Sequence, residues 1–255
     1  MSTDLVRATV TDGVLHLQLN RPDKKNALTR AMYTALADAL DAARVDPAQR
    51  VVLFSGAGSA FSAGNDIADF AASRGRVDEV ARFIGLIVDY PKPLVAAVHG
   101  AAIGLGTTML LHCDLAWAAP SARFKTPFVD LGLVPEAGSS LLMPRAFGYV
   151  RAAQMLLLGD TLDADTAAAW GLVNGVVSEA ELLAVATAAA RKLATRAPAA
   201  LRAAKALMRG NIRAEVLAAV QVEGDRFKEH LTSPEAMEAL TAFMQKRAPD
   251  FSRFE

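Results

Sequence analysis

The chain has 255 residues, enough for one large domain or a core with a small appendage, and its hydrophobic fraction of 53% excludes general disorder. Its 27 basic and 27 acidic residues balance, so the clustered basic excess of a nucleic-acid surface is not expected. The single cysteine, Cys113, excludes an internal disulfide and any multi-cysteine metal site, and no histidine pair has the spacing of metal ligands.

The sequence features that bear on location favour the cytoplasm. Residues 1–10 carry early charges and lack the apolar stretch of a signal peptide, and the chain ends in Ser-Arg-Phe-Glu, which is not a peroxisomal address. No apolar run reaches the roughly 18 residues that cross a bilayer. We therefore expect a cytoplasmic protein that binds neither a membrane nor nucleic acid.

The first part of the chain alternates strand-like and helix-like segments. Leu15, Leu17 and Leu19 alternate with polar residues, which is typical of a half-buried strand. Residues 29–44 carry apolar side chains at helical spacing, and the short apolar runs 51–54, 93–98 and 115–118 predict buried strands, the last after an apolar helix from residue 105. Strands of this kind alternating with helices predict a parallel α/β architecture.

After about residue 160 the pattern becomes helical. Strand-like character is confined to residues 173–177, and the helices are expected at residues 167–172, 179–194, 199–208, 213–228 and 234–246. We therefore predict an α/β core over residues 1–195 and a helical region over residues 196–255.

Two loops rich in small residues follow buried strands. Residues 55–66 lead into a helix that begins near Asp66, and such a loop leaves unpaired N–H groups close to a ligand. An ordinary turn capped by Asn65 or Asp66 explains the same pattern and is the commoner case. The second loop, residues 100–108, superficially resembles a dinucleotide fingerprint, but Met109 stands where the last glycine is required.

A third segment, residues 130–140, carries a glutamate among apolar and small residues. Burial in apolar surroundings raises the pKa of a carboxyl group, so that Glu136 could act as a proton shuttle. A glutamate in the first turn of the following helix, stabilised by the helix dipole, is an equally good interpretation.

Taken together and in order, these segments resemble the crotonase (enoyl-CoA hydratase/isomerase) family over nearly the whole chain. The matching blocks are Asn20 to Leu28, Phe61 to Ile67, Lys92 to Gly106, Cys113 to Ala116, Leu131 to Gly138, Gly171 to Val173 and Phe243 to Phe251.

The resemblance implies a crotonase fold, which is a spiral of ββα units followed by a C-terminal helical trimerisation region that also covers the active site. It implies a homotrimer or a dimer of trimers, an acyl-CoA substrate and no separate cofactor. It also implies that the backbone N–H groups of Asn65 and Leu105 form an oxyanion hole. Implied CoA contacts are Lys24, Lys25, Ala27, Leu28, Ala63, Asp66 and Ile67.

Within this resemblance, the carbonyl of Ala63 would read the adenine amine and Lys24 or Lys25 would meet phosphates. Phe70, Phe83 and Ile84 line an acyl pocket or belong to the plain core. Whether His99 or Asp130 assists at the site stays open.

The chain departs from the hydratases of this family at two positions. Thr108 and Phe128 stand where hydratases carry the two glutamates that hold and activate water, whereas Glu136 stands where Δ3,Δ2-enoyl-CoA isomerases keep their single acid/base. We therefore predict an enoyl-CoA isomerase. A hydratase-like enzyme, an aromatic acyl-CoA isomerase of the same fold and a non-catalytic CoA-thioester-binding member are the alternatives.

Overall fold

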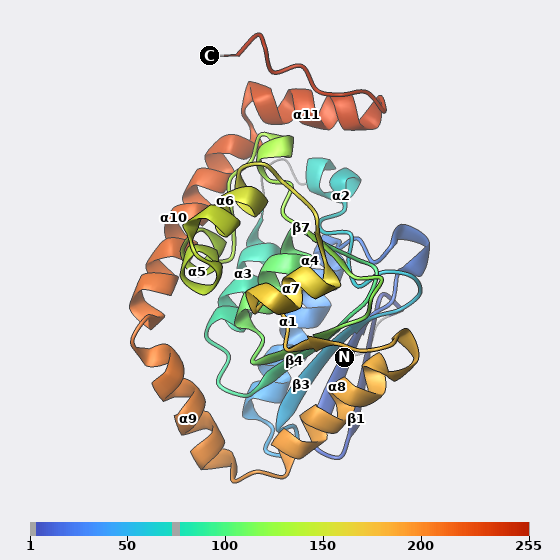
Figure 1. Cartoon of the computed structure of the whole chain (residues 1–255), viewed down its shortest axis with the longest axis vertical. Coiled ribbons are helices and arrows are strands. Elements are labelled where there is room, and N and C mark those ends of the chain that lie inside the picture. The colour runs from blue at the N-terminus through green and yellow to red at the C-terminus, as the bar shows by residue number, and fades with distance from the viewer. Residues whose placement is uncertain (1–3, 73–76, 255) are drawn as a thin grey trace.

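The computed structural model describes residues 4–72 and 77–254, except for the side chains of residues 70–72. Within these residues, a six-stranded sheet and a three-stranded sheet form the α/β core, and a run of helices extends along one edge (Figure 1). The crotonase-type architecture expected from the sequence is confirmed.

The larger sheet has the strand order β1-β2-β3-β4-β6-β9. All its neighbouring strands are parallel except β1 and β2, which form an antiparallel hairpin. The turn of this hairpin is Asp12-Gly13, and both residues have positive φ angles, of 52° and 78°, as a tight two-residue turn requires. The strands are β1 (Val6–Thr11), β2 (Val14–Leu19), β3 (Val51–Gly56), β4 (Leu94–Val98), β6 (Leu115–Ala118) and β9 (Gly175–Val176).

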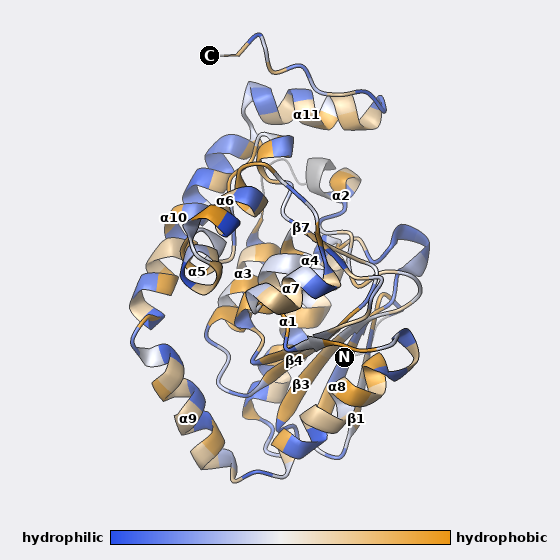
Figure 2. Cartoon of the chain, viewed as in Figure 1, coloured by the Kyte–Doolittle hydropathy of each residue, from blue (hydrophilic) through white to orange (hydrophobic). Residues whose placement is uncertain are grey.

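The central strands β3 and β4 are apolar because helices cover both faces of the sheet. Every residue of these two strands is buried. Val52 and Phe54 point to the main core beneath α1 (Arg30–Val45) and α3 (Asp78–Val88), whereas Val51 and Leu53 point to α8 (Glu179–Ala194). Helix α8 contributes a stripe of buried residues at intervals of four, and Figure 2 shows the hydrophobic strands that it covers.

The smaller sheet, ordered β5-β7-β8, lies beside the first. It consists of β5 (Ala101–Ile103), β7 (Arg123–Lys125) and β8 (Leu162–Asp163). The remaining helices of the core are α2 (Ile67–Ala72), α4 (Leu105–Thr108), α5 (Ser139–Phe147), α6 (Tyr149–Leu156) and α7 (Ala164–Trp170), with 3-10 turns η1 (Pro22–Lys24), η2 (Met109–His112) and η3 (Val129–Leu131). The apolar helix expected from residue 105 is therefore an α-helix of one turn continued by a 3-10 turn.

Three helices end the chain: α9 (Pro198–Gly210), α10 (Arg213–Leu231) and α11 (Pro234–Met244). Figure 1 shows α9 and α10 running along one edge of the molecule and α11 crossing its end near α2. Lys205 is the buried residue of α9, and its ammonium group bonds a carboxylate oxygen of Asp114 at 2.7 Å and the carbonyl oxygen of Lys92 at 2.8 Å. These two contacts attach α9 to the segments that precede β6 and β4.

Candidate active site

The loop after β3 is held between two other segments of backbone. On one side, the N–H of Leu28 donates to the carbonyl oxygen of Gly64 at 2.7 Å, and the N–H of Asp66 donates to that of Leu28 at 2.9 Å. This pattern is a parallel bridge between Leu28 and Asn65, in which the residues on either side of Asn65 make the bonds. The N–H of Asn65 itself consequently points away from the bridge.

On the other side, the loop packs against the segment that leads into α4. Ser62 and Ala102 form a second parallel bridge, and a Cβ atom at Gly106 would lie 3.1 Å from the Cβ of Ser62. Glycine at this position therefore allows the start of α4 to approach the loop closely. Because Leu105 is the first residue of α4, its N–H has no acceptor within the helix.

Asn65 and Leu105 line one cavity, and among the described residues the N–H group of neither donates a hydrogen bond to another backbone or side-chain group. Two N–H donors without a protein acceptor beside one cavity are suited to hold an oxygen atom that becomes negatively charged.

Glu136 lines the same cavity and is 6% exposed. The hydroxyl of Thr108 donates to its Oε1 atom at 2.9 Å. Burial raises the pKa of Glu136 to about 7, although the bond from Thr108 acts in the opposite direction. A carboxyl group of this kind can both accept and return a proton near neutral pH.

The interpretation of Glu136 as a glutamate of the first helical turn is wrong. Helix α5 begins at Ser139, after a turn in which Ala137 and Gly138 have left-handed φ angles of 57° and 74°. The carboxylate at the start of this helix is that of Glu223 from α10, which accepts bonds from the N–H groups of Gly138 and Ser140. Glu136 is therefore left with its carboxyl group in the cavity.

Tyr33 supports the Asn65 side of the site and was not singled out by the sequence. Its hydroxyl donates to Oδ1 of Asn65 at 2.5 Å, and its ring lies 5.7 Å from that of Phe83. Burial, and next the charge of Glu136, raise the pKa of Tyr33 well above its ordinary value, so the phenol stays protonated as a donor.

The cavity has a volume of about 530 Å³, and its wall is completed by the C-terminal helices. From the core it is lined by Ala63, Gly64, Asn65, Ile67, Ile103, Gly104, Leu105, Lys125, Pro127, Phe128, Asp130, Leu131, Leu133 and Glu136, and from the C-terminal region by Phe227, Ala239, Phe243, Arg247 and Pro249. The five C-terminal residues had not been singled out individually, because nothing in their local pattern shows that α10 and α11 turn back over the core.

Four of the residues expected to bind CoA lie in the wall of the cavity or beside it. Ala63 and Ile67 line the cavity, whereas Lys24 and Lys25 are exposed beside it, on the segment that bonds the loop through the N–H of Ala63 and the carbonyl of Lys25 at 2.9 Å. Among the described residues, neither lysine takes part in an ion pair. Ala27 is half-buried in this segment.

Two further members of that set have structural contacts of their own. Leu28 is buried in the main core. Asp66 caps α2 by accepting from the N–H of Asp69 at 2.9 Å, and it pairs with Arg21 at 2.6 Å. Although burial opposes it, these bonds lower the pKa of Asp66, so its side chain is an ionised helix cap rather than a free ligand contact.

Other candidates lie outside the reacting centre. His99 bonds the carbonyl oxygen of Gly58 at 2.9 Å on an exposed loop, and Phe83 and Ile84 belong to the main core rather than to the cavity wall. The side chain of Phe70 lies outside the described residues. Asp130 lines the cavity, but its carboxylate pairs with Lys125 at 2.9 Å.

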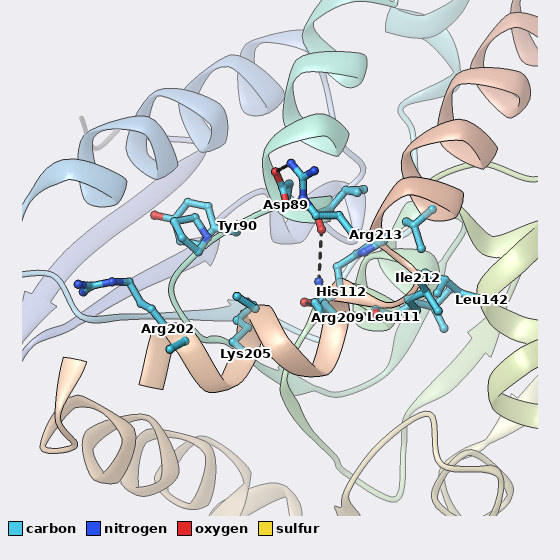
Figure 3. Close-up of a pocket in the computed structure, with 15 residues that line it drawn as sticks. Asp89, Tyr90, Leu111, His112, Leu142, Arg202, Lys205, Arg209, Ile212 and Arg213 are labelled. Carbon is cyan, nitrogen blue, oxygen red and sulfur yellow. Dashed lines mark hydrogen bonds and ion pairs between the residues drawn. The ribbon is translucent and has the colours of Figure 1, made fainter. Parts of the chain in front are cut away.

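A second cavity, of about 550 Å³, lies between α9, α10 and the end of α3 (Figure 3). Its cationic side chains are largely engaged by the protein: Arg213 pairs with Asp89, Lys205 binds Asp114 as described, and Arg209 donates to main-chain carbonyl groups. These contacts attach α9 and α10 to the core, and we assign the cavity no part in the chemistry.

The fold and the first cavity define a class of protein. A buried carboxyl group with a pKa near 7 shares a cavity with two unpaired N–H donors, which suits the removal and return of a proton beside a carbonyl group whose oxygen becomes negative.

Among the helices of residues 4–72 and 77–254, none has the length and apolar character to span a membrane.

Comparison with known proteins identifies the family. The sequence profile described as "Enoyl-CoA hydratase/isomerase" matches residues 9–253, and the chain belongs to this family of acyl-CoA enzymes. The enoyl-CoA delta isomerase 2 of Rattus norvegicus is 34% identical over 250 residues, which make up 95% of this chain and 64% of that protein. The 1,2-epoxyphenylacetyl-CoA isomerase of Escherichia coli (strain K12) is 34% identical over 258 residues, 98% of each chain.

Solved structures agree with this assignment. The crystal structure of an enoyl-CoA hydratase/isomerase from Pseudoalteromonas atlantica T6c superposes with a TM-score of 0.93 at 44% identity, covering 97% of this chain and 99% of that one.

Proposed function

We propose that this protein is a Δ3,Δ2-enoyl-CoA isomerase in which Glu136 is the only acid/base. The observation that carries the proposal is the environment of Glu136: it is buried in the cavity with a pKa of about 7, and its neighbour is the hydroxyl of Thr108 rather than a second carboxylate. Hydration needs a group that orients and activates water, and Thr108 and Phe128 cannot take a proton from water at neutral pH.

The reaction needs one base and one site for negative charge. The carboxylate of Glu136 removes a proton from C2 of a 3-enoyl thioester, and the C–H electrons move into a dienolate whose oxygen is held by the N–H groups of Asn65 and Leu105. The same carboxyl group returns the proton to C4, so the double bond moves from C3 to C2 and the glutamate is regenerated. Each N–H donor would lower the barrier by about 3 kcal/mol, since it is fixed before the charge develops.

The CoA moiety would lie across the bridge between the Lys24–Leu28 segment and the Ala63–Ile67 loop. The carbonyl oxygen of Ala63 accepts no backbone hydrogen bond among the described residues, so it is free to accept from the adenine amine. Lys24 and Lys25 are exposed on this segment and would meet the phosphates, so binding would weaken at high salt as these charges are screened.

The test is a comparison of two thioesters. Purified protein should produce the absorbance of a conjugated thioester from a 3-enoyl-CoA, and should cause little loss of that absorbance from a 2-enoyl-CoA. The variant Glu136→Gln should lose roughly 10²- to 10⁴-fold in kcat, the usual contribution of a general acid/base. Asp130→Asn, which removes the paired carboxyl group of the same cavity, should lose less than about tenfold.

Each contrary outcome identifies a different mechanism. Isomerase activity that persists in Glu136→Gln would refute the assignment of the acid/base. Rapid loss of the 2-enoyl absorbance would show hydratase chemistry. If a thioester binds without any exchange of its C2 protons, the protein is a binding member of the family.

A second candidate is isomerisation of an aromatic acyl-CoA. It is favoured by the full-length similarity to 1,2-epoxyphenylacetyl-CoA isomerase and by the aromatic side chains of Phe128, Phe227 and Phe243 in the cavity wall. Inactivity toward both straight-chain substrates, together with turnover of an aromatic epoxide thioester, would select this candidate.

We also propose that the protein is a cytoplasmic homotrimer or a dimer of trimers. Apolar side chains on the outer faces of α6 and α9 support assembly, since Val150, Leu207 and Met208 are more than 70% exposed in the single chain. Light scattering that gives the mass of one chain would contradict this proposal.

A further inference from the structure

The turn between Glu136 and α5 is a strained element that something must hold. Ala137 has a φ angle of 57°, in the left-handed region that a residue with a Cβ atom seldom adopts, and Gly138 follows with 74°. A non-glycine residue in this conformation costs on the order of 1 kcal/mol or more and persists only when its surroundings fix it. The direction of the Glu136 side chain depends on this turn.

Glu223 fixes the turn from the side of α10. Its Oε2 atom accepts from the N–H of Gly138 at 2.5 Å, and its Oε1 atom accepts from both the N–H and the hydroxyl of Ser140, at 2.9 and 2.5 Å. The side chain is 6% exposed, so these bonds do not compete with bulk water. Burial raises the pKa of Glu223, and the three hydrogen bonds act in the opposite direction because they favour its ionised form.

His112 holds the same turn from the opposite side. Its Nε2 atom lies 2.7 Å from the carbonyl oxygen of Ala137, and Figure 3 shows the ring in the wall of the second cavity. Burial lowers the pKa of His112 to about 4, so the ring is neutral at pH 7 and donates to this carbonyl. The turn is therefore clamped between η2 and α10.

We propose that Glu223 is a positioning residue for Glu136: its carboxylate holds the Ala137–Gly138 turn in the one conformation that aims the catalytic carboxyl group into the cavity, and its charge disfavours a second negative charge there. The proposal rests on the proposed role of Glu136 as acid/base. Helix α10 then contributes to the site twice: Glu223 holds the turn, and Phe227, one turn later, lines the cavity.

The surroundings of Glu136 agree with the electrostatic part of this proposal. Burial is the main cause of its raised pKa, and the charge of Glu223 raises it further. The other titratable groups nearby do not offset that charge. Tyr33 of α1 and His112 of η2 are both neutral at pH 7, and the two cations of the cavity wall are paired, Lys125 with Asp130 and Arg247 with Glu238.

The test compares Glu223→Gln and Glu223→Ala with a matched control, Glu215→Gln. Glu215 lies two turns earlier on α10 and accepts a hydrogen bond from Arg145 of α5. It is exposed, and among the described residues it makes no hydrogen bond to the Ala137–Gly138 turn. Three quantities are measured for each variant. The first two are the rate at which the C2 protons of a saturated acyl-CoA exchange in D₂O and the KM for that acyl-CoA. The third is the titration midpoint of Glu136, followed by ¹³C NMR of labelled glutamate carboxyl groups.

For Glu223→Gln we expect the exchange rate to fall roughly 10- to 100-fold, as a misplaced catalytic group does, while KM changes less than about threefold. Loss of the neighbouring charge should also move the midpoint of Glu136 downward by about half a pH unit or more. Glu215→Gln should leave all three quantities as in the wild type. The resonance of Glu136 is identified by its absence from Glu136→Gln.

The proposal is overturned if Glu223→Gln, folded by circular dichroism, keeps its exchange rate within twofold, or loses rate with an unmoved Glu136 midpoint. If Glu223→Ala does not fold, the glutamine variant decides alone. The failure of the proposed function is separate: wild-type protein that exchanges C2 protons without isomerising would refute the isomerase, and the NMR midpoint would still report on Glu223.

Discussion

The burial of Glu136 predicts that ionisation of its carboxyl group lowers the free energy of unfolding. Its pKa is raised from the ordinary 4.5 to about 7 in the folded protein, mainly by burial. Between these two pH values the folded state holds a proton that the unfolded chain has lost, so the free energy of unfolding falls as the pH rises from 4.5 to 7. At about 1.4 kcal/mol per pH unit, this penalty reaches about 3 kcal/mol above pH 7.

The substitution Glu136→Gln removes the ionisation but keeps the shape of the side chain and an oxygen that can accept from Thr108. We expect the variant to be more stable than wild type by about 2 to 3 kcal/mol at pH 8 and by less than about 1 kcal/mol at pH 5. Urea unfolding of both proteins at the two pH values measures this, and the midpoint at pH 8 should rise by roughly 1 M. Other acids titrate alike in both proteins and cancel in the difference. A stability difference that is the same at pH 5 and pH 8 would refute the argument, since it would mean that Glu136 ionises as in water.

Three further substitutions test other parts of the site and fold. Thr108→Val removes the hydrogen bond that favours ionised Glu136, so the acidic limb of the kcat/KM profile should move up by about one pH unit, and an unmoved limb would count against that bond. Gly64→Ala would place a Cβ atom 2.9 Å from the carbonyl oxygen of Ile103, at a backbone φ angle of 83°. The N–H donors should be displaced, so kcat should fall at least about 10²-fold, and steady-state rates near those of the wild type would contradict that displacement. Lys92→Met removes a buried ammonium group that bonds three main-chain carbonyls, and a loss of about 2 to 4 kcal/mol in unfolding free energy is expected from urea denaturation; a loss below 1 kcal/mol would show those bonds to be unimportant.

Much of the fold was predictable because its signals are local. The alternation at Leu15, Leu17 and Leu19 marks β2, and the apolar runs mark β3, β4 and β6 because both faces of the sheet are covered. Strands β5, β7 and β8 have only two or three residues each and are too short to show a period. They form because the tertiary fold holds neighbouring strands beside them.

The site was predictable only in part. Glu136 and the two N–H donors lie in recognisable segments, and the structure brings them to one cavity. Tyr33 and Glu223 carry no local signal, because each meets its partner across a long stretch of chain: Tyr33 binds Asn65, and Glu223 binds a turn that precedes it by more than 80 residues. The CoA contacts of Lys24 and Lys25 stay predictions, since exposed lysines identify no ligand by themselves.

The distance along the chain between Glu136 and Glu223 also sets an order of events during synthesis. A ribosome adds roughly 5 to 20 residues per second, so Glu136 exists for roughly 4 to 17 seconds before the residue that holds its turn has been made. During that interval the strained turn at Ala137 has only the contact from His112 and lacks the bonds from Glu223. A nascent chain can therefore complete its parallel sheet while it is still unable to present an aligned base to a thioester, and competence for catalysis arrives with the last helices.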